Sequence, residues 1–183
     1  MSIFINILTL SRIFLAAFIF LLLMSPDGYL MALILFFLAG ITDYFDGYLA
    51  RKYNAVSHLG EILDPIADKI LILFILFGLS INLSSYLIGF VGATIITREI
   101  WVGALRDYNA RNGKSDVTKV TFLAKVKTTV QLSTLFAYLF GLLINNMLII
   151  IIADIFLFIS LFITLYTGLI YTINSFKNNE ILE

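Results

Sequence analysis

Long apolar segments dominate this sequence and restrict the folds that are open to it. Of the 183 residues, 61% are hydrophobic and only 13% are charged, with a mean hydropathy of +1.01. Soluble domains are about half apolar and about a quarter charged. Because backbone groups inside a bilayer must be hydrogen-bonded within the chain, apolar segments of about 20 residues fold there as helices. The sequence therefore predicts an all-α integral membrane protein with a single domain over residues 1–183.

Short polar breaks divide the chain into six such apolar segments. The expected transmembrane helices cover residues 3–24, 29–53, 59–81, 86–107, 122–144 and 148–176. The stretch 6–12 mixes polar and apolar residues, so an N-terminal segment that lies along the membrane interface is an open alternative there. We therefore expect a multi-pass protein with six transmembrane helices.

The basic residues indicate how these helices are oriented. Lys and Arg lie near the N-terminus, in or beside the second and fourth breaks, and at the C-terminus, while the other three breaks contain none. Basic residues collect on the cytoplasmic side of membrane proteins. Both termini and the basic breaks are therefore expected in the cytoplasm.

Four aspartates stand in or beside the apolar segments, Asp43 and Asp46 in the second and Asp64 and Asp68 in the third. An Asp at the centre of a membrane helix costs roughly 2.5–3.5 kcal/mol on insertion scales, so four of them indicate a function. Their spacings place each pair on one helix face, and an antiparallel hairpin brings both pairs to the same depth. With no Cys and one His in the chain, the available ligands are oxygens, which suit Mg²⁺, Mn²⁺ or Ca²⁺. Two such ions can stabilise a displacement at phosphorus.

A divalent-cation channel or transporter is the alternative function for carboxylates in a membrane. A transporter holds its ligands near the midplane, with polar groups continuing toward both sides. Here the carboxylates lie near one end of their helices, beside a cluster of basic residues. This placement favours an enzyme that acts on anionic substrates.

Small residues accompany the aspartates. Gly47, Ala50 and Gly60 lie within about a turn of one or another of them, and a missing side chain lets a flat group approach the backbone. Gly40 and Gly89 lie farther along the helices, where small residues usually permit close helix packing. We expect that packing role for these two glycines.

The segment from Asp43 to Asp68 resembles the signature of the CDP-alcohol phosphotransferases. The pattern of that family is D-x2-D-G-x2-A-R-x8-G-x3-D-x3-D, and the chain matches it without departure at Asp43, Asp46, Gly47, Ala50, Arg51, Gly60, Asp64 and Asp68. Less specific matches resemble the bacterial phosphatidylglycerophosphate synthases within the family. They cover residues 6–12, 63–69, 98–100, 104–106 and 125–131.

The resemblance implies a fold, a reaction and a location. It implies a homodimer of six-helix chains in a bacterial-type inner membrane, with a site that faces the cytoplasm. The implied reaction transfers a phosphatidyl group from CDP-diacylglycerol to sn-glycerol 3-phosphate, giving phosphatidylglycerophosphate and CMP. Sister enzymes that use inositol phosphate, serine or phosphatidylglycerol as acceptor remain an alternative. Membrane lipids are the expected surroundings, and no nucleic-acid partner is expected.

The resemblance also implies roles for the signature residues. Asp43, Asp46 and Asp64 would bind a divalent metal, Mg²⁺ or Mn²⁺ and most simply two ions. Asp68 would bind metal or act as the general base. The CDP moiety would contact the positions Asp43, Asp46, Gly47, Ala50, Arg51 and Gly60.

Glycerol 3-phosphate is a dianion, so its pocket should contain cations. Arg98 is the leading candidate because it lies in an apolar stretch and a guanidinium can hold phosphate through two parallel bonds. Arg106, Lys125 and Lys127 come next. The alternative is that Arg98 only pairs with Glu99 or another acid, while the lysines only set the orientation of the chain.

Overall fold

The protein is described by a computed structural model that covers residues 2–52, 58–114 and 122–177, apart from the side chains of residues 2–5, 46, 49–51, 58, 59, 61 and 62. Over these ranges the chain forms helices and contains no strand. The α-helices and one 3-10 turn are α1 (Ser2–Leu22), η1 (Pro26–Gly28), α2 (Tyr29–Lys52), α3 (His58–Asn82), α4 (Tyr86–Arg111), α5 (Phe122–Leu143) and α6 (Met147–Lys177). The predicted all-α fold with six long helices is confirmed.

Three helices end in the same hydrogen-bonded motif. In each, one residue has a positive φ: Ser84 after α3 (49°), Gly113 after α4 (69°) and Asn145 after α5 (51°). After α4, the Gly113 and Lys114 amides donate to the carbonyls of Ala110 and Asn109 at 3.1 and 2.8 Å, which is the Schellman pattern. The helix therefore continues to Arg111, one turn beyond the expected end at residue 107, because Gly113 is the residue that stops it.

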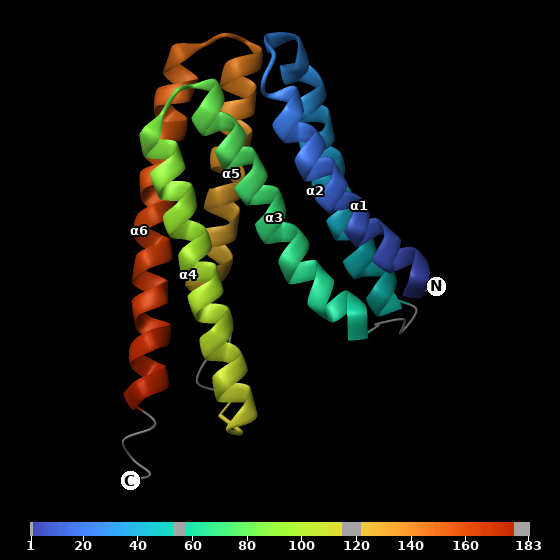
Figure 1. Ribbon diagram of the computed structural model, residues 1–183, viewed down its shortest axis with the longest axis vertical. Helices are drawn as coiled ribbons and strands as arrows, with labels where there is room; N and C mark the ends of the chain where they lie inside the picture. Colours follow the sequence, from blue (N-terminus) through green and yellow to red (C-terminus); the bar gives the residue numbers. More distant parts are fainter. Residues whose placement is uncertain (1, 53–57, 115–121, 178–183) are drawn as a thin grey trace.

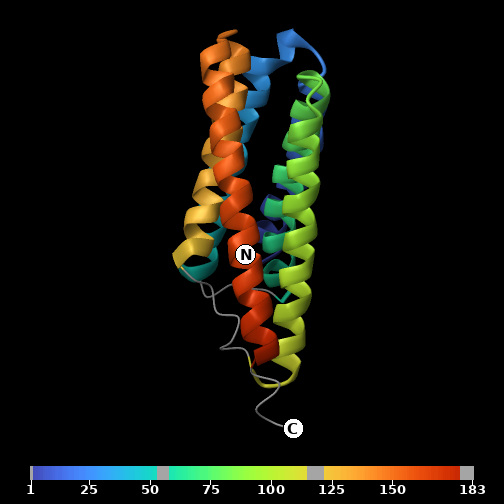
Figure 2. The same ribbon diagram turned by 90° about the vertical axis from the view of Figure 1, so that its left-hand side faces the viewer.

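The six helices form two groups that approach each other at the end of the bundle opposite the chain termini (Figure 1). Helix α1 packs against α2 and α3, and α6 packs against α4 and α5. Contacts of α3 with α4 and of α2 with α5 join the two groups. Figure 2 shows the same bundle from the side of α6, with all long helices running roughly along one direction. The N- and C-terminal ends lie at the same end of the bundle, as the basic residues predicted.

Among the described residues, four helices are long and apolar enough to cross a membrane by length and composition, through the segments Pro26–Phe45, Tyr86–Arg111, Phe122–Leu143 and Met147–Lys177. The apolar part of α1 is shorter, Asn6–Leu22, and α3 carries Asp64, Asp68 and Lys69. These two helices lie against each other, so their charged residues meet inside the bundle. The stretch 6–12 belongs to α1 and forms no separate element.

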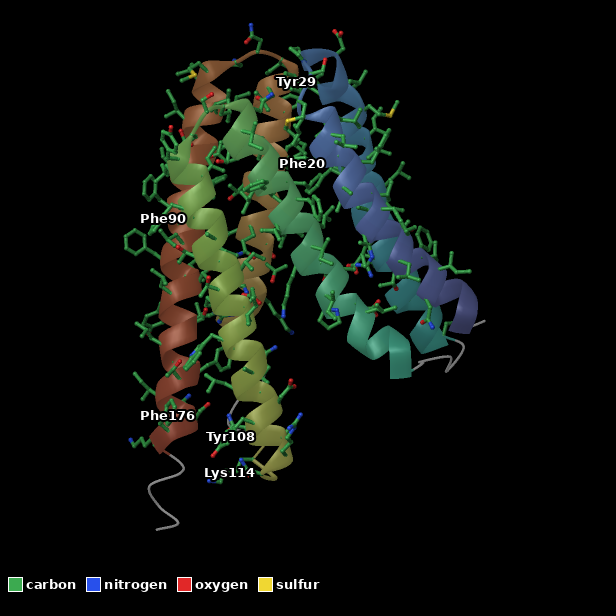
Figure 3. All side chains as sticks on the ribbon, in the orientation of Figure 1. Phe20, Tyr29, Phe90, Tyr108, Lys114 and Phe176 are labelled. Atoms are coloured by element: carbon green, nitrogen blue, oxygen red, sulfur yellow. The ribbon has the colours of Figure 1, made fainter. Side chains whose placement is uncertain are left out.

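The outer surface of the bundle is apolar. Large side chains such as Phe14, Tyr86 and Phe122 are more than three-quarters exposed, and Phe90 points away from the bundle in Figure 3. The inner core consists mainly of Ala, Leu, Ile and Val side chains from all six helices, together with Phe36 and Tyr138, and holds few charges. Since so continuous an apolar surface is unfavourable in water, its natural surroundings are lipid.

The two glycines that were expected to allow close packing differ in the structure. A Cβ on Gly89 would stand 2.8 Å from Ser80 Oγ, so Gly89 does permit the tight turn between α3 and α4. A Cβ on Gly40 would meet no atom within 4 Å. The expected packing role is therefore confirmed for Gly89 and wrong for Gly40, which faces open space.

Candidate active site

Three of the signature aspartates converge on one arginine of α1. Arg12 Nη1 donates to Asp43 Oδ1 and, at 2.7 Å, to Asp68 Oδ1, while Arg12 Nη2 lies 3.3 Å from Asp64 Oδ1. Thr9, one turn earlier in α1, donates from Oγ1 to the same Asp64 oxygen at 2.8 Å. Helices α1, α2 and α3 therefore meet in a polar group, which we call the carboxylate cluster (Thr9, Arg12, Asp43, Asp64 and Asp68).

Arg12 and the aspartates differ sharply in exposure. The Arg12 side chain is 1% exposed, whereas those of Asp43, Asp64 and Asp68 are 50%, 42% and 50% exposed. The guanidinium thus lies on the inner side of the cluster, and the carboxylates keep an open side. A ligand can reach the carboxylates from that side without unfolding α1.

The hairpin prediction holds where the structure describes it. Asp43 on α2 and both Asp64 and Asp68 on α3 reach the same guanidinium, so the two helices bring these residues together as their spacing predicted. The Asp46 side chain lies outside the described part. Sequence reasoning missed the contribution of α1, although Thr9 and Arg12 stand three residues apart on one face of an apolar helix. That spacing is the signal that could have found them.

A cleft opens beside the cluster, between α3, α4 and α5. It encloses about 270 Å³ and is lined by Pro65, Asp68, Lys69, Ile72, Ile95, Ile96, Arg98, Glu99, Val102, Gly103, Arg106, Ala124, Lys127, Thr128 and Gln131. Figure 1 shows α3 diverging from α4 toward the end of the bundle that carries the chain termini. Asp68 belongs both to the carboxylate cluster and to the lining of this cleft.

The cleft wall on α4 and α5 holds an ion-pair network. Glu99 accepts hydrogen bonds from Arg98 Nη1 at 2.8 Å and from Lys127 Nζ. Arg98 also donates to the Thr164 carbonyl at 3.1 Å and to Thr167 Oγ1 at 2.8 Å, both on α6. Arg98 and Lys127 are each 7% exposed. The Arg98–Glu99 pair that was considered as an alternative therefore exists, and it stands in the cleft wall.

The other two predicted cations are placed differently. Arg106 lines the cleft; its guanidinium lies 5.4 Å above the Tyr171 ring, and its buried Nε has no hydrogen-bond partner among the described residues. Lys125 is exposed and does not line the cleft. The structure thus brings Arg98, Arg106 and Lys127 together and leaves Lys125 apart.

The positions expected to contact CDP lie at the ends of α2 and α3 that carry the cluster. Gly60 is buried and Gly47 is half-buried. The side chains of Ala50 and Arg51 lie outside the described part. The backbone of α2 is helical from Asp43 up to Lys52, and Gly60 lies in the first turn of α3.

An apolar groove lies between α2, α3 and α5. It is lined by Phe36, Phe37, Gly40, Ile41, Tyr44, Phe45, Leu71 and Leu132. Gly40 and Tyr44 flank Asp43 on α2, so the groove begins within a turn of a cluster carboxylate. A molecule with a charged head and apolar tails could place both parts here.

The donor set of the cluster fits a hard divalent cation in kind. The three carboxylate oxygens that surround Arg12 are ligands that Mg²⁺ and Mn²⁺ prefer. Within the part of the chain whose side chains are described, no group of three acidic or His side chains is arranged to hold an ion. The Arg12 guanidinium lies between the carboxylates of Asp43, Asp64 and Asp68.

Comparison with known proteins identifies the family of this chain. The family model of CDP-alcohol phosphatidyltransferases matches residues 3–167, which include the cluster and the cleft. The chain belongs to this family. A relative from Pectobacterium atrosepticum is 38% identical over 136 residues, which are 73% of this chain and 75% of the relative. Relatives from Salmonella choleraesuis and Escherichia coli K12 are 36% and 37% identical over 132 residues, 71% of this chain and 72% of each relative. All three carry the name CDP-diacylglycerol–glycerol-3-phosphate 3-phosphatidyltransferase.

Proposed function

We propose that this CDP-alcohol phosphatidyltransferase moves the phosphatidyl group of CDP-diacylglycerol to sn-glycerol 3-phosphate and releases CMP. One observation carries the proposal: Asp68 joins the carboxylate cluster to a cleft rich in cations. Four cationic and two acidic side chains line that cleft, Lys69, Arg98, Arg106, Lys127, Asp68 and Glu99. The excess of two positive charges complements the dianionic acceptor. The names of the three relatives support the same substrates.

The position of Asp68 suits a general base. With the acceptor phosphate near Arg106 and Lys127, a free hydroxyl of glycerol 3-phosphate can face the Asp68 carboxylate, and such proton transfer typically contributes 10²–10⁴-fold. The hydroxyl oxygen forms a bond to the phosphatidyl phosphorus, and the bond from that phosphorus to the CMP oxygen breaks. The hydroxyl proton passes to Asp68, and CMP leaves with the electron pair of the broken bond.

Asp43, Asp46, Asp64 and Asp68 would hold divalent metal, Mg²⁺ or Mn²⁺ and most simply two ions. Bound there, the metal would neutralise charge on the diphosphate and on the departing CMP. The oxygen-only donor set supports this choice of metal. Gly47, Ala50, Arg51 and Gly60 would contact CDP together with Asp43 and Asp46.

The apolar surroundings fit a lipid donor. The diacyl tails can remain in the bilayer beside α2 while the CDP head group occupies the cluster. The positive-inside pattern supports a bacterial-type inner membrane location, with the termini and the site on the cytoplasmic side. A homodimer is proposed from family resemblance alone.

The acceptor can be tested by a comparison of alcohols. We expect purified protein with CDP-diacylglycerol and Mg²⁺ or Mn²⁺ to release CMP when glycerol 3-phosphate is added. Inositol phosphate, serine and phosphatidylglycerol should give little CMP, because their charge or size does not match the cleft. CMP quantified by chromatography is the measurement. A preference for one of the other three alcohols would assign the chain to a sister activity.

Gly103→Leu should narrow the acceptor cleft. Gly103 lines the cleft, and a Cβ there would meet no atom within 4 Å, so a leucine folds without a clash and occupies space meant for substrate. We expect KM for glycerol 3-phosphate to rise about tenfold, with KM for CDP-diacylglycerol nearly unchanged. Gly40→Leu is the matched control, because Gly40 also faces open space but lines the apolar groove. A larger acceptor KM effect from Gly40→Leu would contradict the placement of the cleft.

A further inference from the structure

Arg12 is the most buried charged side chain that the structure describes, and the reaction proposed above gives it no role. Its guanidinium is 1% exposed and reaches carboxylates on two other helices. Because an arginine stays protonated in proteins, this positive charge is permanent. A permanent charge at this place must influence whatever other cation binds the carboxylates.

We propose that Arg12 is an internal counter-ion that holds the carboxylate cluster together without metal and competes with the divalent cation for the same oxygens. This inference rests on the metal site of the proposed function. It concerns how Arg12 affects the affinity of the carboxylates for a divalent cation and the stability of the fold.

The competition follows from the atoms involved. Arg12 takes one oxygen, Oδ1, from each of Asp43, Asp64 and Asp68, and a single nitrogen, Nη1, serves two of them. A cation that bound Asp43 or Asp68 through Oδ1 would therefore contact an oxygen that Arg12 already holds. A metal bound at these oxygens must displace the guanidinium or stand close to its charge. Either event opposes metal binding and reduces its apparent affinity.

The arrangement places one cation beside three carboxylates. Unpaired carboxylates in a low-dielectric site repel one another, whereas here each has a cationic partner. Removal of Arg12 leaves three half-exposed carboxylates without this cation, so the repulsion between them should lower the stability of the fold. Thr9 bonds Asp64 Oδ1 as well, so Asp64 retains one fixed contact when Arg12 moves away.

The test measures Mn²⁺ binding and thermal unfolding of the full-length protein in detergent. The variants are Arg12→Gln, Arg12→Lys and the control Arg111→Gln, since Arg111 is exposed at the end of α4. Free Mn²⁺ is followed by its electron paramagnetic resonance signal. We expect Arg12→Gln to bind Mn²⁺ about tenfold more tightly than wild type, and Arg12→Lys severalfold more tightly. In EDTA, Arg12→Gln should unfold at a lower temperature than wild type, and saturating Mn²⁺ should narrow that difference.

The outcomes separate this inference from the proposed function. Equal or weaker Mn²⁺ binding by both Arg12 variants, with normal binding by wild type and Arg111→Gln, would overturn the inference and leave the metal site intact. An unfolding difference that Mn²⁺ does not change would also overturn it. A wild-type protein that forms product but binds no Mn²⁺ would overturn the metal site and the inference together. If Arg12→Gln folds only in the presence of Mn²⁺, the counter-ion role is supported. The change in Mn²⁺ affinity is then measured with Arg12→Lys.

Discussion

Asp68→Asn is expected to reduce CMP release at saturating substrates by at least about 100-fold. Asp68 lines the acceptor cleft and belongs to the carboxylate cluster, so the asparagine removes a proton acceptor and a metal ligand at once. The side chain keeps its size, and the helix around it is unchanged. Initial rates of CMP formation, with saturating glycerol 3-phosphate and Mg²⁺, are the measurement.

Asp107→Asn is the matched control for this change. Asp107 is exposed on α4 and does not line the cleft, so its replacement removes one carboxylate without touching the site. Its rate should stay within about twofold of wild type, as for most surface substitutions. Undiminished activity of Asp68→Asn would exclude Asp68 as the base.

Lys127→Met should raise KM for glycerol 3-phosphate roughly 10- to 100-fold. The Lys127 ammonium lies in the cleft wall and is held there by Glu99, and hydrogen bonds to charged groups contribute about 1.5–3 kcal/mol each. Methionine has a similar volume, and it removes the ammonium together with its hydrogen bond to Glu99. Steady-state rates over a range of glycerol 3-phosphate concentrations give the constant.

Lys125 offers a control two residues away on the same helix. It is exposed and stands outside the cleft lining, so Lys125→Met should change the acceptor KM less than about twofold. Both variants lose one positive charge, so the difference between their acceptor KM values isolates the effect of the cleft position. Equal effects of the two substitutions would show that the lysines act only through the overall charge of this face.

Much of the fold follows from local patterns in the sequence. The helix ends were predictable because polar breaks and membrane length fix them, and most agree with the structure to within a few residues. Helix α4 differs because its polar last turn stays helical until Gly113 adopts a positive φ. Polarity alone does not end a helix; a residue that accepts the left-handed conformation does.

The site was predictable only where its residues share a helix or a hairpin. The spacing of the aspartates predicted that Asp43 lies near the pair on α3, because antiparallel helices joined by a short loop place these residues at the same depth. Arg12 lies 31 residues before Asp43, and no local rule brings α1 against α3. The same limit applies to Arg98, which the sequence placed either with Glu99 or with substrate. The structure shows the pair within the cleft wall, so the two alternatives do not exclude each other.

The most direct test of the central claim is the identity of the lipid product. Purified protein in lipid vesicles that contain CDP-diacylglycerol, with glycerol 3-phosphate and Mg²⁺ outside, is analysed by mass spectrometry for lipids and by chromatography for CMP. The account predicts phosphatidylglycerophosphate and CMP in equal amounts, both abolished by EDTA and by Asp68→Asn. Movement of Mn²⁺ across the vesicle membrane without any new lipid or CMP would contradict it and favour a cation transporter.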